Sequence, residues 1–305
     1  MEERDVIGGT GKQIRLSRLF SNRDGRAVVF AFDHGMQVGP VPGAVDLRAG
    51  VALAVEAGFD GIILGPGALD RTVDLLRGTD RPAVIMRLDQ TTMWRLGGQF
   101  SDSEGHTREI ADVEDAMRLG ADAVLTFLFT CHRDPELETR SVEILGRAAR
   151  SARNWGMPLV VEPMAAREGR LKTPFDAETV AMNSRIAVEI GADVIKTDWS
   201  GTIEGFRHVV QGAADAPVLV AGGPRLDDDR ATLGLVRDLL AAGARGVMFG
   251  RSLFQSPEPL VLMKAVRDMV HADVSFEDAV ARLSPAPAKA PKAQLSRARP
   301  KSRPK

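Results

Sequence analysis

Residues 189–197 read EIGADVIKT, and the form of this stretch decides the fold. A helical pattern ends, a glycine follows, and a short apolar run typical of a buried strand comes next. Three other stretches share this form: EAGFDGIIL (56–64), RLGADAVLT (118–126) and AAGARGVMF (241–249). Their glycines are 62, 71 and 52 residues apart, and each interval has room for two strand–helix units. The four stretches therefore predict eight such units.

Four further apolar runs lie between these stretches and supply the remaining strands. They are AVVFAFD (27–33), PAVIMRLD (82–89), PLVVEPM (158–164) and PVLVAGG (217–223). Strands that alternate with amphipathic helices and are apolar nearly throughout indicate a parallel sheet with both faces covered. We therefore predict an α/β fold, a single-domain (β/α)8 TIM barrel over residues 27–283, because closure removes exposed strand edges. An open doubly wound sheet is the structural alternative.

The composition, 44% hydrophobic and 27% charged, is that of an ordinary globular protein. Residues 1–26 lead into the barrel without an apolar leader, which favours a cytoplasmic location. Residues 284–305 hold seven lysines or arginines and no acid, so a disordered basic tail is expected there. The net charge of −1 without these seven cations is −8, and no specific nucleic-acid or membrane partner is expected. Cys131 is the only cysteine, which excludes an internal disulfide.

Lys196 is the unusual residue among the predicted strand ends, where barrels of this kind place their active sites. It lies inside an otherwise apolar strand, and a buried ammonium group is costly unless it is paired or deprotonated. A lysine with a lowered pKa can attack a carbonyl carbon, and the resulting iminium withdraws electrons during aldol cleavage or condensation. A lysine that reaches the rim or forms a structural ion pair is the alternative.

Carboxylates at the ends of three strands are expected near this lysine. They are Asp33, Glu162 and Asp198. One carboxyl group must move protons during the carbinolamine and enamine steps. A buried salt bridge to Arg87 or Lys196 is the alternative role for each. Arg87 and Asp198 are the candidates for substrate binding, and Arg87 with Asp89 is expected to contact the far end of the substrate.

A phosphate cradle is predicted after the last three strands, where such barrels commonly bind phosphate. Its six residues are Ser200, Gly201, Gly222, Gly223, Gly250 and Arg251. The glycines let backbone amides approach an anion, and the arginine can add a bidentate contact. A plain turn role is the alternative for each glycine.

With these residues in place, the sequence resembles the archaeal-type class I fructose-bisphosphate aldolases of the DeoC/FbaB group. The resemblance covers nearly all of residues 13–271 and rests on AFDHGMQVGP (31–40), GADVIKTDWSG (191–201), VLVAGGP (218–224) and GVMFGRSLFQSPEP (246–259). It implies Lys196 as the Schiff-base lysine, Asp33 as an acid near the imine, and the six cradle residues around a substrate phosphate.

The same resemblance implies a mechanism without metal or cofactor, apart from the covalent Schiff base. It further implies a phosphorylated sugar or a substrate like dihydroxyacetone phosphate, and a homo-oligomer, commonly of ten subunits.

The sequence departs from the fructose-bisphosphate members in one respect. They carry a catalytic tyrosine after the fifth strand, whereas this chain has no tyrosine and reads VVEPM there. Glu162 is similar to the glutamate of the tagatose-bisphosphate and sulfofructose-phosphate aldolases, and is therefore expected to be the acid–base group. The phospho-autoinducer-2 thiolase, a relative that also lacks the tyrosine, is similar at AFDHG and GRSLFQSPEP. The resemblance thus predicts a class I aldolase acting on a phosphorylated ketose, with acyl transfer to coenzyme A or a condensing synthase reaction as alternatives.

Two hypotheses of other classes remain. A zinc-dependent aldolase would use His34, His132 and the carboxylates of the mouth, and a non-catalytic barrel would use none of them.

Residues 94–105 (WRLGGQFSDSEG) form a long polar segment that is expected to lie over the mouth.

Overall fold

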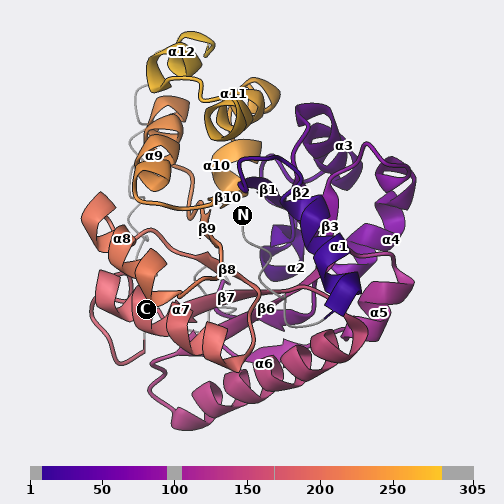
Figure 1. The fold of residues 1–305 in the computed structure, drawn as a ribbon, viewed down its shortest axis with the longest axis vertical. Helices are drawn as coiled ribbons and strands as arrows, with labels where there is room; N and C mark the ends of the chain where they lie inside the picture. Colours follow the sequence, from indigo (N-terminus) through magenta and orange to yellow (C-terminus); the bar gives the residue numbers. More distant parts are fainter. Residues whose placement is uncertain (1–8, 95–104, 168, 284–305) are drawn as a thin grey trace, which may run out of the picture.

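The computed structural model describes residues 9–94, 105–167 and 169–283. Eight parallel strands close into a barrel in the order β1-β10-β9-β8-β7-β6-β3-β2 (Figure 1). The strands of this barrel are β1 (Ala27–Ala31), β2 (Gly61–Leu64), β3 (Ala83–Arg87), β6 (Ala123–Thr130), β7 (Leu159–Ala165), β8 (Val194–Thr197), β9 (Val218–Ala221) and β10 (Gly246–Phe249). The predicted TIM barrel is confirmed, and the alternative of an open sheet is wrong.

Helices cover the outside of the strands, with α6 running along the side opposite α9, α11 and α12 (Figure 1). The described helices are α1 (Gly9–Leu19), α2 (His34–Val38), α3 (Leu47–Ala57), α4 (Pro66–Thr72), the 3-10 helix η1 (Val73–Leu76), α5 (Val113–Arg118), α6 (Pro135–Trp155), α7 (Ala177–Ile190), α8 (Ile203–Gly212), α9 (Asp229–Ala241), α10 (Arg251–Phe254), α11 (Pro259–His271) and α12 (Phe276–Ala281). The predicted tail (284–305) and nearly all of the predicted mouth segment (94–105) lie outside the described residues.

The four repeated stretches have the predicted form. Their glycines lie within two residues of the ends of α3, α5, α7 and α9, and all have positive φ, which favours glycine. The angles are 67° at Gly58, 76° at Gly120, 133° at Gly191 and 96° at Gly243. Each glycine thus reverses the chain from a helix into a barrel strand.

In three of the repeats, an aspartate lies two residues after the glycine and connects neighbouring strands. Each aspartate accepts a hydrogen bond from a backbone N–H near the start of the adjacent strand. The three pairs are Asp60 with Val28 (2.6 Å), Asp122 with Val84 (2.9 Å) and Asp193 with Leu159 (2.8 Å). Because each side chain satisfies a backbone donor that would otherwise lack a partner, the repeat fixes strand register at the amino-terminal end of the barrel.

Helix α1 closes that same end. Leu16, Leu19 and Phe20 pack against the apolar side chains that fill the barrel interior. Lys12 forms a buried ion pair with Asp193 at 2.9 Å. Catalytic side chains are therefore confined to the opposite, carboxyl-terminal end of the strands.

A small hairpin that the sequence did not predict lies beside the barrel. Its strands β4 (Asp89–Thr91) and β5 (Thr107–Glu109) pair antiparallel.

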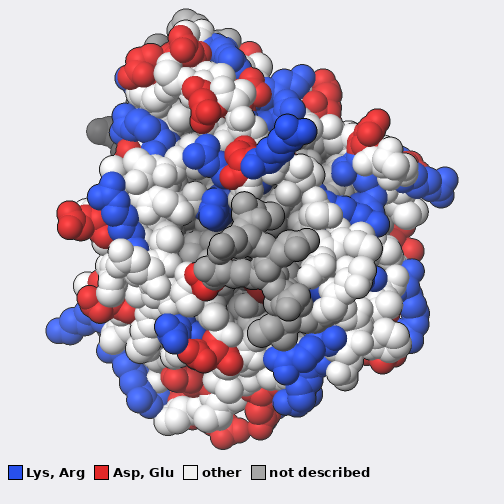
Figure 2. All heavy atoms as spheres, in the orientation of Figure 1, with Lys and Arg blue, Asp and Glu red and all other residues white. Residues whose placement is uncertain are grey.

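Acidic and basic side chains are interspersed over the face drawn in Figure 2, with no broad area of one sign among its described atoms. Within the described ranges, no helix is both long and apolar enough to cross a membrane.

His271, at the end of α11, joins two aspartates at the amino-terminal end of the barrel. Its Nδ1 lies 2.7 Å from Asp24 and its Nε2 lies 2.8 Å from Asp60, so the protonated ring can donate to both. Burial opposes this charge, but the bonds to Asp60 and Asp24 outweigh it and raise the pKa of His271 above 6.5. The stabilisation is therefore complete below pH 6.5 and is lost as the pH rises through the raised pKa.

We expect His271→Gln to lower the free energy of unfolding by about 2 kcal/mol at pH 6, and by less at pH 9, because charge-assisted hydrogen bonds are lost. Urea unfolding at the two pH values measures the difference. His208→Gln is the matched control, because its ring is exposed and lies 3.3 Å from a single carboxylate, that of Glu178. An equal loss at both pH values would contradict the charged state assigned to His271.

Candidate functional site

Lys196 lies on β8 with its side chain directed into the carboxyl-terminal end of the barrel. The residue is 5% exposed, and its Nζ is 2.7 Å from Oε1 of Glu162. Strand register explains this contact, because Val161 of β7 lies opposite Ile195 of β8 and the two charged residues come next. The structure therefore brings the predicted nucleophile and the predicted acid–base group into direct contact.

Arg87 connects the same glutamate to the other side of the barrel. Its Nη2 donates to Oε2 of Glu162 at 2.5 Å, and its Nε donates to Oδ2 of Asp33 at 2.8 Å. The guanidinium also lies 3.8 Å above the centre of the Phe127 ring. A continuous chain of charges thus runs from Lys196 through Glu162 and Arg87 to Asp33.

This arrangement keeps Asp33 ionised. Burial opposes its charge, but the attraction of Arg87 and Lys196, together with the hydrogen bond from Arg87, outweighs burial and lowers the pKa of Asp33 to about 2. Asp33 is therefore an anion at neutral pH.

Asp89 is held in place by hydrogen bonds from β6. Its Oδ2 accepts hydrogen bonds from the Thr126 hydroxyl at 2.6 Å and the Phe127 backbone at 2.7 Å. Its other oxygen lies 3.5 Å from Arg87. Because Arg87 is 1% exposed and Asp89 is fully buried, the contact of both with the far end of a substrate stays a prediction.

Asp198 lies two residues beyond Lys196, just past the end of β8, and is half-buried. Burial and the negative charge of Glu162 raise the pKa of Asp198 to about 7. Arg167, Lys196 and Arg251 partly offset that rise. Asp33 and Asp198, at the same mouth, therefore differ widely in their affinity for protons.

The six predicted cradle residues lie on three loops that follow neighbouring strands. β8, β9 and β10 are adjacent in the barrel, and Ser200–Gly201, Gly222–Gly223 and Gly250–Arg251 follow them in turn. Oγ of Ser200 and Nε of Arg251 are buried without a hydrogen-bond partner among the described residues. Unpaired buried donors are costly, so these atoms are suited to a bound anion.

Gly250 is required by close packing. A Cβ at this position would lie 2.4 Å from Cε1 of His34 and 2.6 Å from the backbone oxygen of Ala31. His34 lies beyond the end of β1 and is the first residue of α2. Its ring packs edge-on against Phe254 of α10, with 5.3 Å between ring centres.

Sequence reasoning missed Arg225, which lies two residues after the glycine pair of the β9 loop. Its Nη2 donates to Asp229 at 3.0 Å, and Asp229 in turn accepts from Ser256 at 2.6 Å. Its Nη1 is buried without a partner among the described residues. The GGPR sequence was the signal that could have found it, since a cation beside a glycine pair is typical of anion binding.

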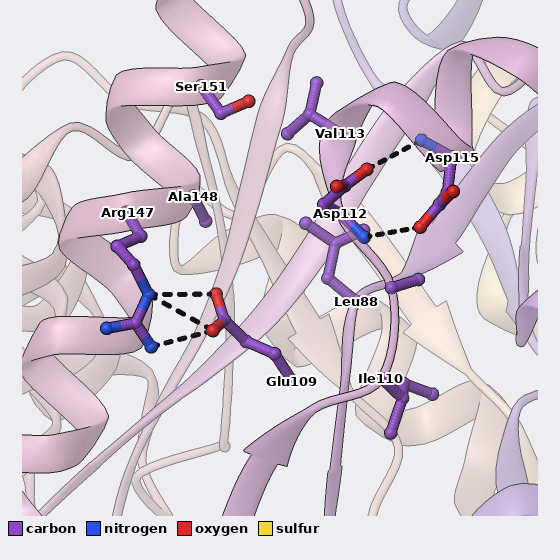
Figure 3. Close-up of a pocket in the computed structure, with 10 residues that line it drawn as sticks. Leu88, Glu109, Ile110, Asp112, Val113, Asp115, Arg147, Ala148 and Ser151 are labelled. Carbon is purple, nitrogen blue, oxygen red and sulfur yellow. Dashed lines mark hydrogen bonds and ion pairs between the residues drawn. The ribbon is translucent and has the colours of Figure 1, made fainter.

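Two hollows differ in their relation to these charges. One adjoins Asp33 and is lined largely by apolar groups, among them Met36, Pro40 and Pro66. The other lies between β5, α5 and α6 (Figure 3), where Arg147 and Glu109 pair at 2.7 Å. Asp112 and Asp115, which also line the second hollow, accept hydrogen bonds from each other's backbone N–H groups. The charged groups of the second hollow thus have partners, so the first hollow is better suited to extend the site. In the described part of the chain, no cluster of three or more histidine, cysteine or acidic side chains could hold a metal ion.

Comparisons with known proteins agree with this geometry. A family model described as DeoC/LacD family aldolase matches residues 27–256. The 2-amino-3,7-dideoxy-D-threo-hept-6-ulosonate synthase of Halobacterium salinarum is 36% identical over 272 residues, which are 89% of this chain and 96% of the relative. The class 1 fructose-bisphosphate aldolase of Thermoproteus tenax is 31% identical over 261 residues, 83% of this chain and 92% of the relative.

A solved structure of an aldolase is also similar to this chain. An archaeal fructose-1,6-bisphosphate aldolase, with its catalytic lysine covalently bound to the carbinolamine intermediate, superposes with a TM-score of 0.75 at 29% identity. The match covers 86% of this chain and all of that chain.

Arg87 is expected to stabilise the fold because it compensates buried carboxylates. We expect Arg87→Met to lower the free energy of unfolding by about 3 to 5 kcal/mol at pH 7, since these charges lose their cation. The pKa of Asp33 is lowered from its ordinary value of 3.8 to about 2, so its ion pair contributes to the free energy of unfolding above pH 3.8. This contribution is lost as the pH falls from 3.8 through about 2. The difference in the free energy of unfolding between the variant and the wild type should therefore become smaller from pH 5 to pH 2.

Urea unfolding across that range measures the effect. Arg140→Met is the control, because Arg140 is exposed and lies 4.0 Å from its ion-pair partner on the same helix, Glu136. A loss in Arg87→Met no larger than in the control would show that the buried carboxylates do not need Arg87 to compensate their charge.

Proposed function

The chain belongs to the DeoC/LacD aldolase family and is a class I aldolase, a carbon–carbon lyase; from this premise we propose that Lys196 forms a Schiff base with a phosphorylated ketose. One observation carries the assignment: Lys196 is buried at the carboxyl end of a barrel strand, and its Nζ is 2.7 Å from a carboxylate. A nucleophilic amine requires such a base within hydrogen-bonding distance.

Glu162 moves the proton at Nζ of Lys196 in the proposed mechanism. Its carboxylate takes one proton from the ammonium, and the neutral amine attacks the carbonyl carbon of the substrate. Glu162 gives this proton to the carbonyl oxygen, which becomes the hydroxyl of a carbinolamine, and takes a second proton from the nitrogen. Glu162 then protonates this hydroxyl, which leaves as water and yields the iminium. Arg87 keeps Glu162 in position throughout, through the contact at 2.5 Å.

Asp33 has an electrostatic role in this mechanism. It is anionic, because its pKa is lowered to about 2, and the charge of Lys196 contributes to that lowering. A fixed anion near the nitrogen favours the cationic iminium over the neutral amine. Cleavage of the substrate then moves the bonding electrons of the broken carbon–carbon bond into the iminium, which becomes an enamine.

The three adjacent loops after β8, β9 and β10 support phosphate binding by the six predicted cradle residues. The donors Ser200 Oγ and Arg251 Nε, which have no partner among the described residues, favour an anion there. Arg225 is a further candidate in the β9 loop. The homo-oligomer implied by the resemblance, up to a decamer, stays a prediction.

A condensing synthase is the second candidate function. The 36% identity to the Halobacterium salinarum synthase favours it, and the chemistry at Lys196 would be shared up to the enamine. The two candidates differ in the aldehyde that the enamine meets. The apolar hollow beside Asp33 offers space for this partner.

Borohydride reduction with dihydroxyacetone phosphate tests the Schiff base. We expect a stable adduct on Lys196, found by intact mass and peptide mapping, and no adduct in Lys196→Arg, because a guanidinium does not form an imine. Lys12→Arg is the matched control, since Lys12 is also a buried lysine paired with a carboxylate, at 2.9 Å. No adduct in a folded wild-type protein would contradict the proposed function.

Phosphate binding is tested at Gly223, where φ is +63° and no atom lies within 4 Å of the position that a Cβ would occupy. We expect Gly223→Ala to raise the concentration of dihydroxyacetone phosphate needed for half-maximal trapping about tenfold, because a methyl group in the cradle would weaken anion binding by about 1.4 kcal/mol. Gly120→Ala is the control, since this glycine has a similar φ of +76° and lies outside the site. Equal effects in the two variants would contradict the cradle.

A further inference from the structure

Asp198 differs from the other carboxylates at the mouth of the barrel. Asp33 and Asp89 both contact Arg87, and Glu162 contacts Arg87 and Lys196. Among the described residues, no cation lies within 4 Å of the Asp198 carboxylate and no hydrogen bond reaches it. It is therefore the one mouth carboxylate in this part of the chain that is free to exchange a proton without first breaking an ion pair.

The position of Asp198 suits a reaction at carbon. It lies one residue past the end of β8 and two residues after Lys196, and the charges of Lys196 and Glu162 both act on the pKa of its carboxyl group. It therefore lies at the same mouth as the nitrogen to which a substrate becomes attached. The charged groups around it are Glu162, Lys196, Arg167 and Arg251, which come from β7, β8, the β7 loop and α10.

We propose that Asp198 is the acid–base residue of the carbon–carbon bond step, distinct from Glu162, which serves the nitrogen. This assignment rests on the proposed function. In cleavage, Asp198 takes the proton of the substrate hydroxyl whose carbon becomes the aldehyde. The oxygen electrons form the new C=O bond, the carbon–carbon bond breaks, and its electrons form the enamine on Lys196. Asp198 then returns the proton to the enamine carbon, and water hydrolyses the resulting iminium.

The ionisation of Asp198 matches this role. Burial raises its pKa to about 7, so both protonation states are populated near neutral pH. Glu162 is less suited to the same task, because it is held in ion pairs with two cations within 2.7 Å. Asp33 is held ionised by Arg87.

Solvent exchange of dihydroxyacetone phosphate isolates this proton transfer. The iminium on Lys196 loses a C–H proton to Asp198 and regains a deuteron from D2O, which NMR measures without a partner aldehyde. We expect Asp198→Asn to slow exchange at least 100-fold, since acid–base groups contribute about 10² to 10⁴ in rate. Borohydride trapping on Lys196 should remain within about threefold of wild type, because Glu162 is intact. In the wild-type enzyme, exchange should rise with pH through about 7 as the carboxylate forms.

Two further variants complete the test. Asp198→Glu keeps a carboxyl group and should retain measurable exchange with a displaced pH midpoint, which a purely structural role would not produce. Asp70→Asn, an exposed carboxylate on α4, is the matched control and should leave exchange unchanged. Normal exchange in Asp198→Asn, with normal trapping, overturns the assignment and leaves the proposed function standing. Absence of trapping in the wild-type enzyme overturns both.

Discussion

The ion pairs of Arg87 are the interaction on which the rest of the mouth depends. One guanidinium from β3 holds carboxylates from the β1 end and from β7, and the β7 carboxylate holds Lys196 on β8. Burying these charges costs free energy that their mutual attraction offsets only when the geometry is good. The network is therefore better understood as a device that fixes positions than as a source of stability. It sets the distance between nucleophile and base within hydrogen-bonding range.

Both ends of the barrel use buried carboxylates, but with different partners. At the amino-terminal end, Asp60, Asp122 and Asp193 each bind a backbone N–H and a cationic side chain. Such groups have few free lone pairs and hold strand register. At the carboxyl-terminal end, Asp33 and Glu162 bind side-chain cations, and Asp198 binds none among the described residues. The same residue type is thus structural at one end and suited to chemistry at the other, according to its partners.

The sequence predicted the barrel well because each strand–helix unit carries local signals. The glycines, the apolar runs and the strand-end position of Lys196 could all be identified without knowing the neighbours. The hairpin β4–β5 could not, since DQT and TRE are polar three-residue strands without an apolar period. A salt bridge to Arg87 or Lys196 was the alternative role for Asp33, Glu162 and Asp198, and it is observed for Asp33 and Glu162. Which of the three carboxylates bind Arg87 could not be predicted, because Asp33 and Glu162 lie 54 and 75 residues away in sequence and meet it only when the barrel closes.

The absence of tyrosine explains why the carboxylates must differ in charge state. Schiff-base aldol chemistry moves one proton at nitrogen and another at oxygen or carbon, and these transfers occur at different places. A phenol has an ordinary pKa of about 10, so it stays protonated at neutral pH unless nearby cations lower that pKa by about three units. A carboxyl group beside a cation does not stay protonated, because the cation keeps it ionised. In a chain without tyrosine, one carboxylate beside a cation and another apart from the cations supply both protonation states: the pKa of Asp33, beside Arg87, is lowered to about 2, and the pKa of Asp198 is raised to about 7.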